Sequence, residues 1–353
     1  MKKIAGIQQI GIGVTDVYEA LKWYKEVLGY DVVIFDEAAE ANLMVRYTEN
    51  KPQNRHAILA YNFKGGGGFE IWQYTSRTPV PPVFEIQLGD LGIYACKIKS
   101  PDVEKAHKEF RKKDVNIISE LKNSPEGKPH FFIKDPYDNI FEVEEGDGDD
   151  WLLNHEKPTG GNSGVIIGVS DIEKSIKFYS SILGYDTVVY DEEGVFDDLA
   201  GLPGSKEKYR RVLLKHSKKR AGAFSPLLGN SRIELIQTRT REVRKIYKNR
   251  LWGDLGYIHL CYDIIGMEDL KKECEDLGHP FTVDSSNSFD MGEAAGHFSY
   301  IEDPDGALIE FVETHKIPII KKIGWYLNLQ KRGQLKPLPN WFFKLLASSR
   351  KVK

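Results

Sequence analysis

The chain has 353 residues, of which 41% are hydrophobic and 29% charged. This composition is that of a globular protein and excludes a disordered or fibrous chain, and the length suits about two domains of ~150 residues. The net charge is −3, but it is unevenly spread, because residues 316–353 carry ten Lys or Arg and no acidic residue. No nucleic-acid motif accompanies this basic segment, so we expect no nucleic-acid partner.

The cysteines and the N-terminus indicate a reducing compartment. Cys96, Cys261 and Cys274 are far apart and form no CxxC pair, which argues against a disulfide framework and against a thiolate zinc site. The first apolar stretch is interrupted by Gln8 and Gln9 and is too polar for a signal peptide and too short to span a bilayer. We therefore expect a cytoplasmic protein.

The sequence repeats itself over a long distance. The stretch VTDVYEALKWYKEVLGYDVV, from Val14, returns as VSDIEKSIKFYSSILGYDTVV from Val169, and DPYDNIFEVE, from Asp135, returns as DPDGALIEFVE from Asp303. The stretch between the copies is rich in Gly and Asp, which is typical of a linker. We predict a first domain at residues 1–148, a linker at 149–162, a second domain at 163–315 and a tail at 316–353.

Each copy is expected to open with a strand and a helix. Asp16 and Asp171 are predicted N-caps, and Gly29 and Gly184 suit the left-handed residue that ends a helix. Short apolar strands follow, among them GFEIWQY and SRIELIQ. A second strand and helix then lead to a tight turn and a closing strand. Each copy therefore consists of two βαβββ units.

This order of elements, with the paired phrases VxDxxxxxxFYxxxLGY and DPDGxxIEF, resembles the vicinal oxygen chelate superfamily, the group of glyoxalases, bleomycin-resistance proteins and extradiol dioxygenases. The resemblance covers roughly residues 5–314. It implies an α+β fold in which four βαβββ units pair into two cupped mixed β-sheet domains flanked by helices, and we expect a helical C-terminal tail after them. Function within such a family is diverse, so the fold alone settles little.

The resemblance also implies a divalent metal ion in the cup, held by residues of the first and fourth strands of two paired units. In the second half, where many relatives have a first-strand histidine, this chain has Gly164. The other three positions hold ligand-type residues and form the predicted metal site: Glu234, His259 and Glu310. In the first half the same four positions hold Gln9, Glu70, Ala95 and Glu142. That set has no imidazole, and we expect a weaker site there.

The same residues can be singled out from physical chemistry. Side chains alternate along a strand, so Glu310 shares its face with Leu308 and Val312. A buried carboxylate must meet a cation, a hydrogen-bond donor or a proton, because leaving it ionised and unpaired costs several kcal/mol. Taken singly, a strand histidine is more often structural, and a strand glutamate more often faces water. His297, on the strand before the DPDG turn, is a further candidate acid or base, with a rim or surface position as the alternative.

A metal ion held by Glu and His can chelate two neighbouring oxygens of a substrate and stabilise an enolate or enediolate. The resemblance therefore implies a glyoxalase-like or epimerase-like lyase or isomerase that moves a proton next to a carbonyl, with Glu310 or Glu234 as the base. One divalent ion, Zn, Ni, Mn, Fe or Mg, is the expected cofactor. One alternative is an extradiol-type ring-cleaving dioxygenase, and another is a non-catalytic binding protein of the bleomycin-resistance type. The expected partner is a small molecule with adjacent oxygens, and the protein is expected to be a monomer or a homodimer.

The tail combines aromatic and basic residues. Trp325, Tyr326, Trp341, Phe342 and Phe343 alternate with Lys and Arg. We expect its apolar face to pack on the acidic body while the lysines stay in water. The alternatives are a subunit interface and contact with a membrane surface.

Overall fold

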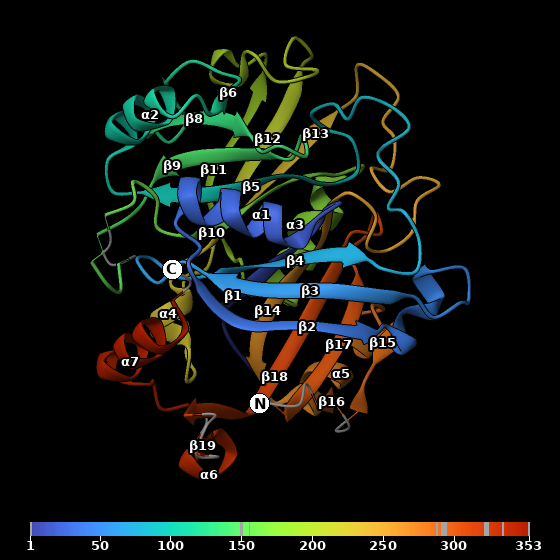
Figure 1. Ribbon diagram of the computed structural model, residues 1–353. Coiled ribbons are helices and arrows are strands. Elements are labelled where there is room, and N and C mark those ends of the chain that lie inside the picture. The colour runs from blue at the N-terminus through green and yellow to red at the C-terminus, as the bar shows by residue number, and fades with distance from the viewer. Residues whose placement is uncertain are drawn as a thin grey trace.

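The computed structural model describes residues 2–148, 151–154, 156–286, 289–290, 295–320, 325–333 and 335–351. Within these ranges the strands form two curled mixed sheets, with helices between them and around their edges (Figure 1). No helix of this described part has the length and apolar character needed to span a membrane.

The first half of the chain supplies two βαβββ units. The first contains β1 (Lys3–Gly13), α1 (Val17–Trp23) with its π-helical extension η1 (Tyr24–Leu28), β2 (Val32–Glu40), the 3₁₀ turn η2 (Asn42–Tyr47), β3 (Asn54–Tyr61) and β4 (Gly68–Tyr74). The second contains β5 (Gly92–Ser100), α2 (Val103–Lys112), β6 (Asn116–Ile117), β7 (Lys122–Asn123), β8 (Pro129–Lys134) and β9 (Ile140–Glu145).

The second half repeats this order. The third unit contains β10 (Asn162–Gly168), α3 (Ile172–Ser181), β11 (Thr187–Gly194), η3 (Asp197–Leu199), β12 (Tyr209–Lys215), α4 (Ser225–Leu228) and β13 (Arg232–Thr238). The fourth contains β14 (Gly256–Ile265), α5 (Met267–Asp276), β15 (Val283–Asp284), β16 (Phe289–Asp290), β17 (Ala295–Glu302) and β18 (Leu308–Ile320). The expected four units and their element order are therefore present.

The units pair differently from the sequence-based expectation. Sheet A, in the order β15-β17-β18-β14-β1-β4-β3-β2 with β16 and β19 at its edge, joins the fourth unit to the first. Sheet B, in the order β11-β12-β13-β10-β5-β9-β8-β6 with β7 beside β8, joins the third unit to the second. The prediction that each half of the sequence closes its own cup is thus wrong. The physical reason is that the long strand β1 pairs antiparallel with β14 from Lys3 opposite Ile265 to Gly13 opposite Gly256.

The predicted helix ends are confirmed. The Asp16 carboxylate accepts hydrogen bonds from the backbone N–H groups of Tyr18 at 2.9 Å and Glu19 at 3.0 Å, and Asp171 accepts one from Lys174 at 3.2 Å. Gly29 has φ of 79°, a left-handed conformation that costs glycine little because it has no Cβ. These local signals fix where α1, η1 and α3 begin and end.

The repeated phrases also connect units within each half. The Tyr24 hydroxyl donates to Asp135 at 2.6 Å, and Tyr179 donates to Asp303 at 3.0 Å. Each aspartate in addition accepts backbone N–H bonds from its own turn, at Tyr137 and Asn139 in the first copy. A helix of one unit is thereby tied to the last turn of the next. One continuous apolar core, which includes α1 and α3, fills the space between the two sheets.

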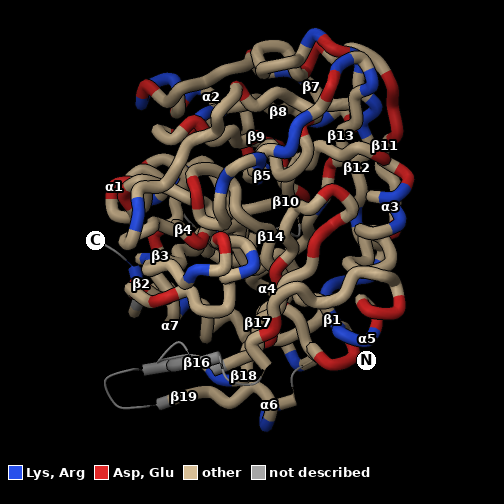
Figure 2. Tube along the Cα trace, turned by 90° about the vertical axis from the view of Figure 1, so that its right-hand side faces the viewer, with Lys and Arg blue, Asp and Glu red and all other residues tan. Residues whose placement is uncertain are grey.

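The tail returns to the body of the protein. It contains β19 (Trp325–Asn328), α6 (Leu329–Arg332) and α7 (Asn340–Arg350). Helix α7 lies beside β2 in both views (Figures 1 and 2). Phe342 and Phe343 are buried, whereas Trp341 is 60% exposed. The tail therefore packs its apolar face on the body, as expected.

Candidate metal centre

Three strands bring three ligand-type side chains together in the cup of sheet A. Glu70 comes from β4, His259 from β14 and Glu310 from β18, and the nearest donor atoms of these residues all lie within 4.8 Å of one another. Gln9, from β1, lies beside them with its amide nitrogen 3.4 Å from Glu70 Oε2. The cluster therefore combines Gln9 and Glu70 of the first unit with His259 and Glu310 of the fourth.

The distances suit ligands that share one ion. His259 Nε2 lies 3.1 Å from Glu310 Oε2 and 3.4 Å from Glu70 Oε2. Two donor atoms that are each about 2.1 Å from the same ion lie about 3.0 to 3.4 Å apart in octahedral or tetrahedral geometry. The side chains would need little rearrangement to coordinate a metal.

The cluster also holds a buried polar atom that remains unsatisfied. Gln9 Oε1 has no hydrogen-bond partner among the described residues, whereas His259 Nε2 pairs with the two carboxylates. Buried polar groups are nearly always paired, and an exception asks for a specific explanation such as an ion. A carboxylate pair, one imidazole and one amide oxygen form a donor set that hard and borderline divalent cations accept. These residues fit a divalent metal.

Electrostatics within the cluster couple the three groups. Burial by itself would lower the pKa of His259, but the charges and hydrogen bonds of Glu310 and Glu70 outweigh it and raise the pKa to about 10. Burial would raise the pKa of Glu70, yet His259 holds it below its usual range. Without metal, a protonated imidazole thus balances the carboxylates, and an ion would have to displace that proton.

The backbone and one tyrosine fix the imidazole ring. A Cβ added at Gly11 would lie 2.5 Å from His259 Cε1, so only glycine leaves room for the ring at this position of β1. The Tyr300 hydroxyl lies 3.4 Å from His259 Nδ1, and the two rings meet edge to face with centroids 5.6 Å apart. Contacts of this kind orient metal-binding histidines through their second nitrogen.

The cup of sheet A retains a cavity of about 130 Å³, which reaches Gln9, Glu70 and Glu310. The other walls are mostly apolar side chains of β2, β3, α4, β18 and α7, together with Gln8 and Thr314. The opposite end of the cup is filled by a cluster of buried aromatic residues that includes Trp72, Trp252 and Tyr300. A ligand next to the cluster would therefore lie against mostly apolar walls.

The cup of sheet B contains a lysine where a metal would be expected. Lys97 Nζ forms ion pairs with Glu142, with Glu234 at 2.8 Å and with Glu144 at 3.4 Å, and Lys97 is 2% exposed. Lys97 lies opposite Glu142 in the parallel pair β5–β9. The equivalent position in sheet A, opposite Glu310 in the pair β14–β18, holds Cys261. An ammonium group thus supplies the positive charge that these carboxylates require.

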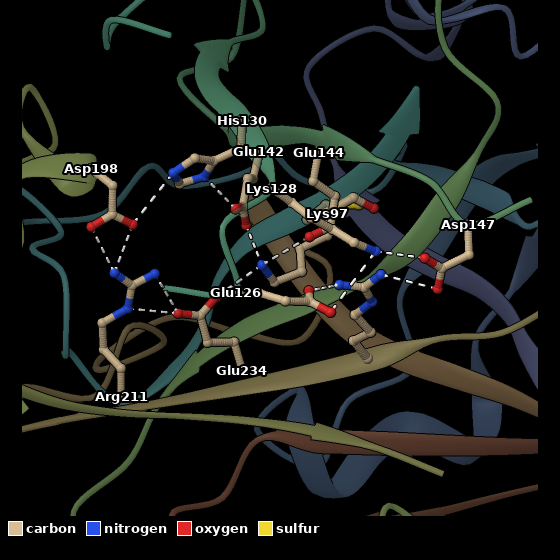
Figure 3. A network of polar contacts seen from close by, with 12 residues as sticks. Lys97, Glu126, Lys128, His130, Glu142, Glu144, Asp147, Asp198, Arg211 and Glu234 are labelled. Atoms are coloured by element: carbon tan, nitrogen blue, oxygen red, sulfur yellow. Dashed lines mark hydrogen bonds and ion pairs between the residues drawn. The ribbon is translucent and has the colours of Figure 1, made fainter. Parts of the chain in front are cut away.

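Further charges complete this network (Figure 3). Arg211 contacts Glu234 at 2.8 Å and Asp198 at 2.7 Å. His130 contacts Glu142 at 2.6 Å and Asp198 at 3.3 Å. Arg211 and Lys97 hold the pKa of Glu234 far below its usual range, against the effect of burial. The cup is otherwise filled by apolar side chains, among them Leu199 and Tyr209.

The structure therefore corrects two expectations about site residues and explains why Gly164 carries no ligand. Glu234 does not meet His259 and Glu310, because β13 belongs to sheet B, and its charge is balanced by Arg211 and Lys97. Glu142 likewise lies in the other cup from Gln9 and Glu70. At Gly164 a Cβ would lie 1.8 Å from the Arg232 carbonyl oxygen, so the local backbone excludes a ligand side chain there.

His297 also lies away from the cluster. On β17 it alternates with Tyr300, which faces the cup, and its Nε2 contacts Asp284 at 2.6 Å. Ser299, on the same face as His297, contacts Met267 of α5. The expectation that His297 reaches into the cup is wrong, because its strand face points toward α5.

Sequence reasoning missed Lys97. The stretch CKIK, residues 96–99, alternates polar and apolar residues and is typical of a strand with one face in water. The available signal was that Lys97 stands two residues after Ala95, on the face that carries the expected ligands. Both Lys97 and Ala95 are buried.

The fold and its cluster define a class of protein built from paired βαβββ modules, with ligand-type side chains on the first and fourth strands of a cup. The chain belongs to the glyoxalase/bleomycin resistance protein/dioxygenase superfamily, whose model matches residues 6–143 and 163–311. No curated protein matches the sequence.

Two solved structures illustrate the likeness in fold. Glyoxalase I from Zea mays is 16% identical, with a TM-score of 0.55 over 89% of this chain and 92% of that chain. A proposed dioxygenase from Bacillus subtilis is 15% identical, with a TM-score of 0.56 over 89% of this chain and 86% of that chain. At these identities the likeness concerns the fold alone.

Proposed function

We propose that the cup of sheet A binds one divalent metal ion through Glu70, His259 and Glu310, with the Gln9 amide oxygen as a fourth ligand. We further propose that the protein is an enzyme that transfers a proton at the carbon next to a carbonyl, in a small substrate with two adjacent oxygens. The observation that supports this most directly is that Glu70, His259 and Glu310, from three different strands, bring donor atoms within 4.8 Å of one another in the cup.

The ion would supply positive charge to the substrate oxygens as negative charge develops on them. Glu310, whose Oε2 lies 3.1 Å from the imidazole of His259, is the proposed base, because its side chain borders the cavity. Glu70 is held by His259 and Gln9, and its proposed role is to bind and position the metal ion. The apolar walls exclude water, which strengthens the electrostatic interactions inside.

The described cluster disfavours the dioxygenase alternative. A ring-cleaving site of that type uses two histidines and one carboxylate around iron. Here one histidine meets two carboxylates and an amide. A non-catalytic binding protein remains the second candidate, and metal content separates it from the enzyme.

The first experiment is metal analysis by mass spectrometry on protein purified without a histidine tag and after reconstitution with Zn²⁺, Mn²⁺, Ni²⁺, Fe²⁺ or Mg²⁺. We expect about one ion per chain, lost in Glu70→Ala, His259→Ala and Glu310→Ala. Glu142→Gln and Glu234→Gln are matched controls, because these carboxylates lie in the other cup. Loss of the metal in the controls alone, or its absence from every reconstituted sample, contradicts the proposal.

Proton transfer is tested separately in D₂O. The metal-loaded protein is mixed with small α-hydroxy ketones and aldehydes, and NMR follows the signal of the proton on the carbon next to the carbonyl. We expect exchange with the wild type and a loss of at least ~100-fold in Glu310→Gln, in line with the usual contribution of a general base. Metal binding without exchange in any compound would favour the binding-protein alternative.

A further inference from the structure

The C-terminal helix takes part in the same cavity as the metal cluster. Phe342 and Leu346 of α7, together with Ile317 of β18, line the cavity that Glu70 and Glu310 border. These residues lie outside the part of the chain that the family model matches. The tail therefore adds a wall to the cup that the βαβββ units alone do not provide.

Several contacts hold α7 in this place. The backbone N–H of Leu338, just before α7, donates to the Ala223 carbonyl at 2.9 Å. The Phe343 and Phe63 rings meet edge to face at 6.3 Å. At the far end Lys351 forms an ion pair of 3.0 Å with Asp31. Both ends of the helix are thus fastened to the first and third units.

Outside the cluster the cavity wall is mostly apolar, and its polar members, Gln8, Tyr61 and Thr314, carry no charge. Among the described residues that line it, the charged ones are Glu70 and Glu310, and no Lys or Arg is present. Phe63, Phe224 and Leu227 line the same cavity and belong to the apolar cluster in which α7 packs. A substrate carboxylate or phosphate at this wall would lose its water without gaining a cationic partner, which disfavours anionic substrates strongly.

The size of the cavity adds a second restriction. Its volume of about 130 Å³ is below the ~300 to 1,000 Å³ of pockets that hold drug-sized ligands. Conjugates of a peptide or a nucleotide would need α7 to leave. A substrate with one ring or a short branched chain next to its two oxygens suits the space.

From these restrictions we propose that α7 determines substrate specificity, so that the site accepts small uncharged substrates with an apolar group beside the two oxygens and rejects anionic ones. This inference rests on the proposed metal site and deepens it. The substrate class follows from Phe342 and Leu346, because they line the cavity that the carboxylates border.

The test uses three hydroxamates, which chelate a metal through two adjacent oxygens and differ in their other end. Benzohydroxamic acid carries a phenyl ring, 4-carboxybenzohydroxamic acid a charged ring, and acetohydroxamic acid a methyl group. Their affinities for Co²⁺-loaded protein are measured by absorbance titration. We expect benzohydroxamic acid to bind at least ~10-fold more tightly than each of the other two.

Leu346→Lys is the decisive variant, because it places a cation at the cavity wall on a partly buried side chain. We expect the preference between the two aromatic probes to shift by at least ~10-fold toward the carboxylate. Trp341→Lys is the matched control on the same helix, since Trp341 is exposed and does not line the cavity. We expect it to leave all three affinities unchanged.

The outcomes separate this inference from the proposed metal site. Absence of bound metal in the wild type overturns the metal site, and the inference with it. If the wild type holds metal but binds the two aromatic probes with equal affinity, the role of α7 is overturned and the metal site stands. The same holds if Leu346→Lys and Trp341→Lys shift the preference between these probes equally. Metal content and the denaturation midpoint confirm that each variant is folded, and Leu346→Ala, expected to weaken benzohydroxamic acid several-fold, replaces Leu346→Lys if that variant does not fold.

Discussion

Replacing Lys97 with methionine tests whether this lysine substitutes for a metal in the cup of sheet B. The change keeps most of the side-chain volume and removes the charge that Glu142, Glu144 and Glu234 share. At the 2.8 Å that separates Lys97 from Glu234, two unit charges attract by about 6 kcal/mol at an effective dielectric constant of ~20. The desolvation of the ions cancels part of this. We expect a loss of about 3 to 5 kcal/mol in the free energy of unfolding.

The loss should depend on pH with a definite sign. In the wild type Arg211 and Lys97 hold the pKa of Glu234 far below its usual range. Its stabilising contribution is therefore present above the unfolded pKa of ~4.3 and is lost as the pH falls toward the folded value. Without Lys97 the pKa of Glu234 rises. The difference between variant and wild type should be largest near pH 7 and smaller near pH 4.

Urea denaturation at pH 7 and pH 4 measures both effects. Lys108→Met is the control, because Lys108 is 73% exposed and forms an ion pair of 3.9 Å with Glu104 on the same helix. Such exposed pairs contribute about 0.3 to 0.5 kcal/mol. A loss below ~1 kcal/mol in Lys97→Met, or the same loss at both pH values, would refute the assignment of Lys97 as the balancing cation.

Three further predictions follow from the same reasoning. The Asp198 and Glu142 hydrogen bonds outweigh burial and raise the pKa of His130 to about 9, so its contribution is present below ~6.5 and lost as the pH rises through 9. His130→Gln should therefore cost more stability in urea at pH 6 than at pH 9.5. Gly11→Ala should push the His259 ring aside and weaken metal binding at least ~10-fold by titration. The control Gly194→Ala, which has open space around the new Cβ, should bind metal as tightly as the wild type does. Tyr24→Phe should lower the free energy of unfolding by about 1 to 3 kcal/mol because buried Asp135 loses a donor, and an unchanged urea midpoint would contradict this.

Local signals in the sequence were sufficient for the four units. The caps at Asp16 and Asp171, the left-handed Gly29 and the turns after Asp135 and Asp303 depend on residues near one another in the chain, and the structure has each of them. Such features need no knowledge of tertiary contacts.

The pairing of the units could not be read in the same way. The first strands of all four units are largely apolar stretches after which a helix begins, and each can in principle pair with any other. Which pairs form depends on register and on contacts made by distant segments. The repeat suggested neighbours within each half, and the actual partners are the outer units and the inner units.

This pairing explains which parts of the candidate site were predicted. His259 and Glu310 were placed together because they lie in one unit. Glu70 and Gln9 were named but assigned to a weaker site, because their partner unit was unknown. Glu234 was assigned to the wrong cup. Its charge is balanced by Lys97 and Arg211, which are distant in the sequence and meet Glu234 only in the folded protein.

The pairing of β1 with β14 has a consequence for synthesis in the cell. Gln9 lies opposite Cys261, so 252 residues separate two positions that must become neighbours, the difference between 261 and 9. At a translation rate of about 5 to 20 residues per second, β1 waits roughly 13 to 50 s before its partner strand emerges. During that interval one edge of β1 is open to pairing with other chains, which is a route to aggregation. A circular permutant that begins in the linker near residue 150, with the original ends joined, would shorten this wait but transfer it to β10, whose sheet B partner β5 would then be synthesised late.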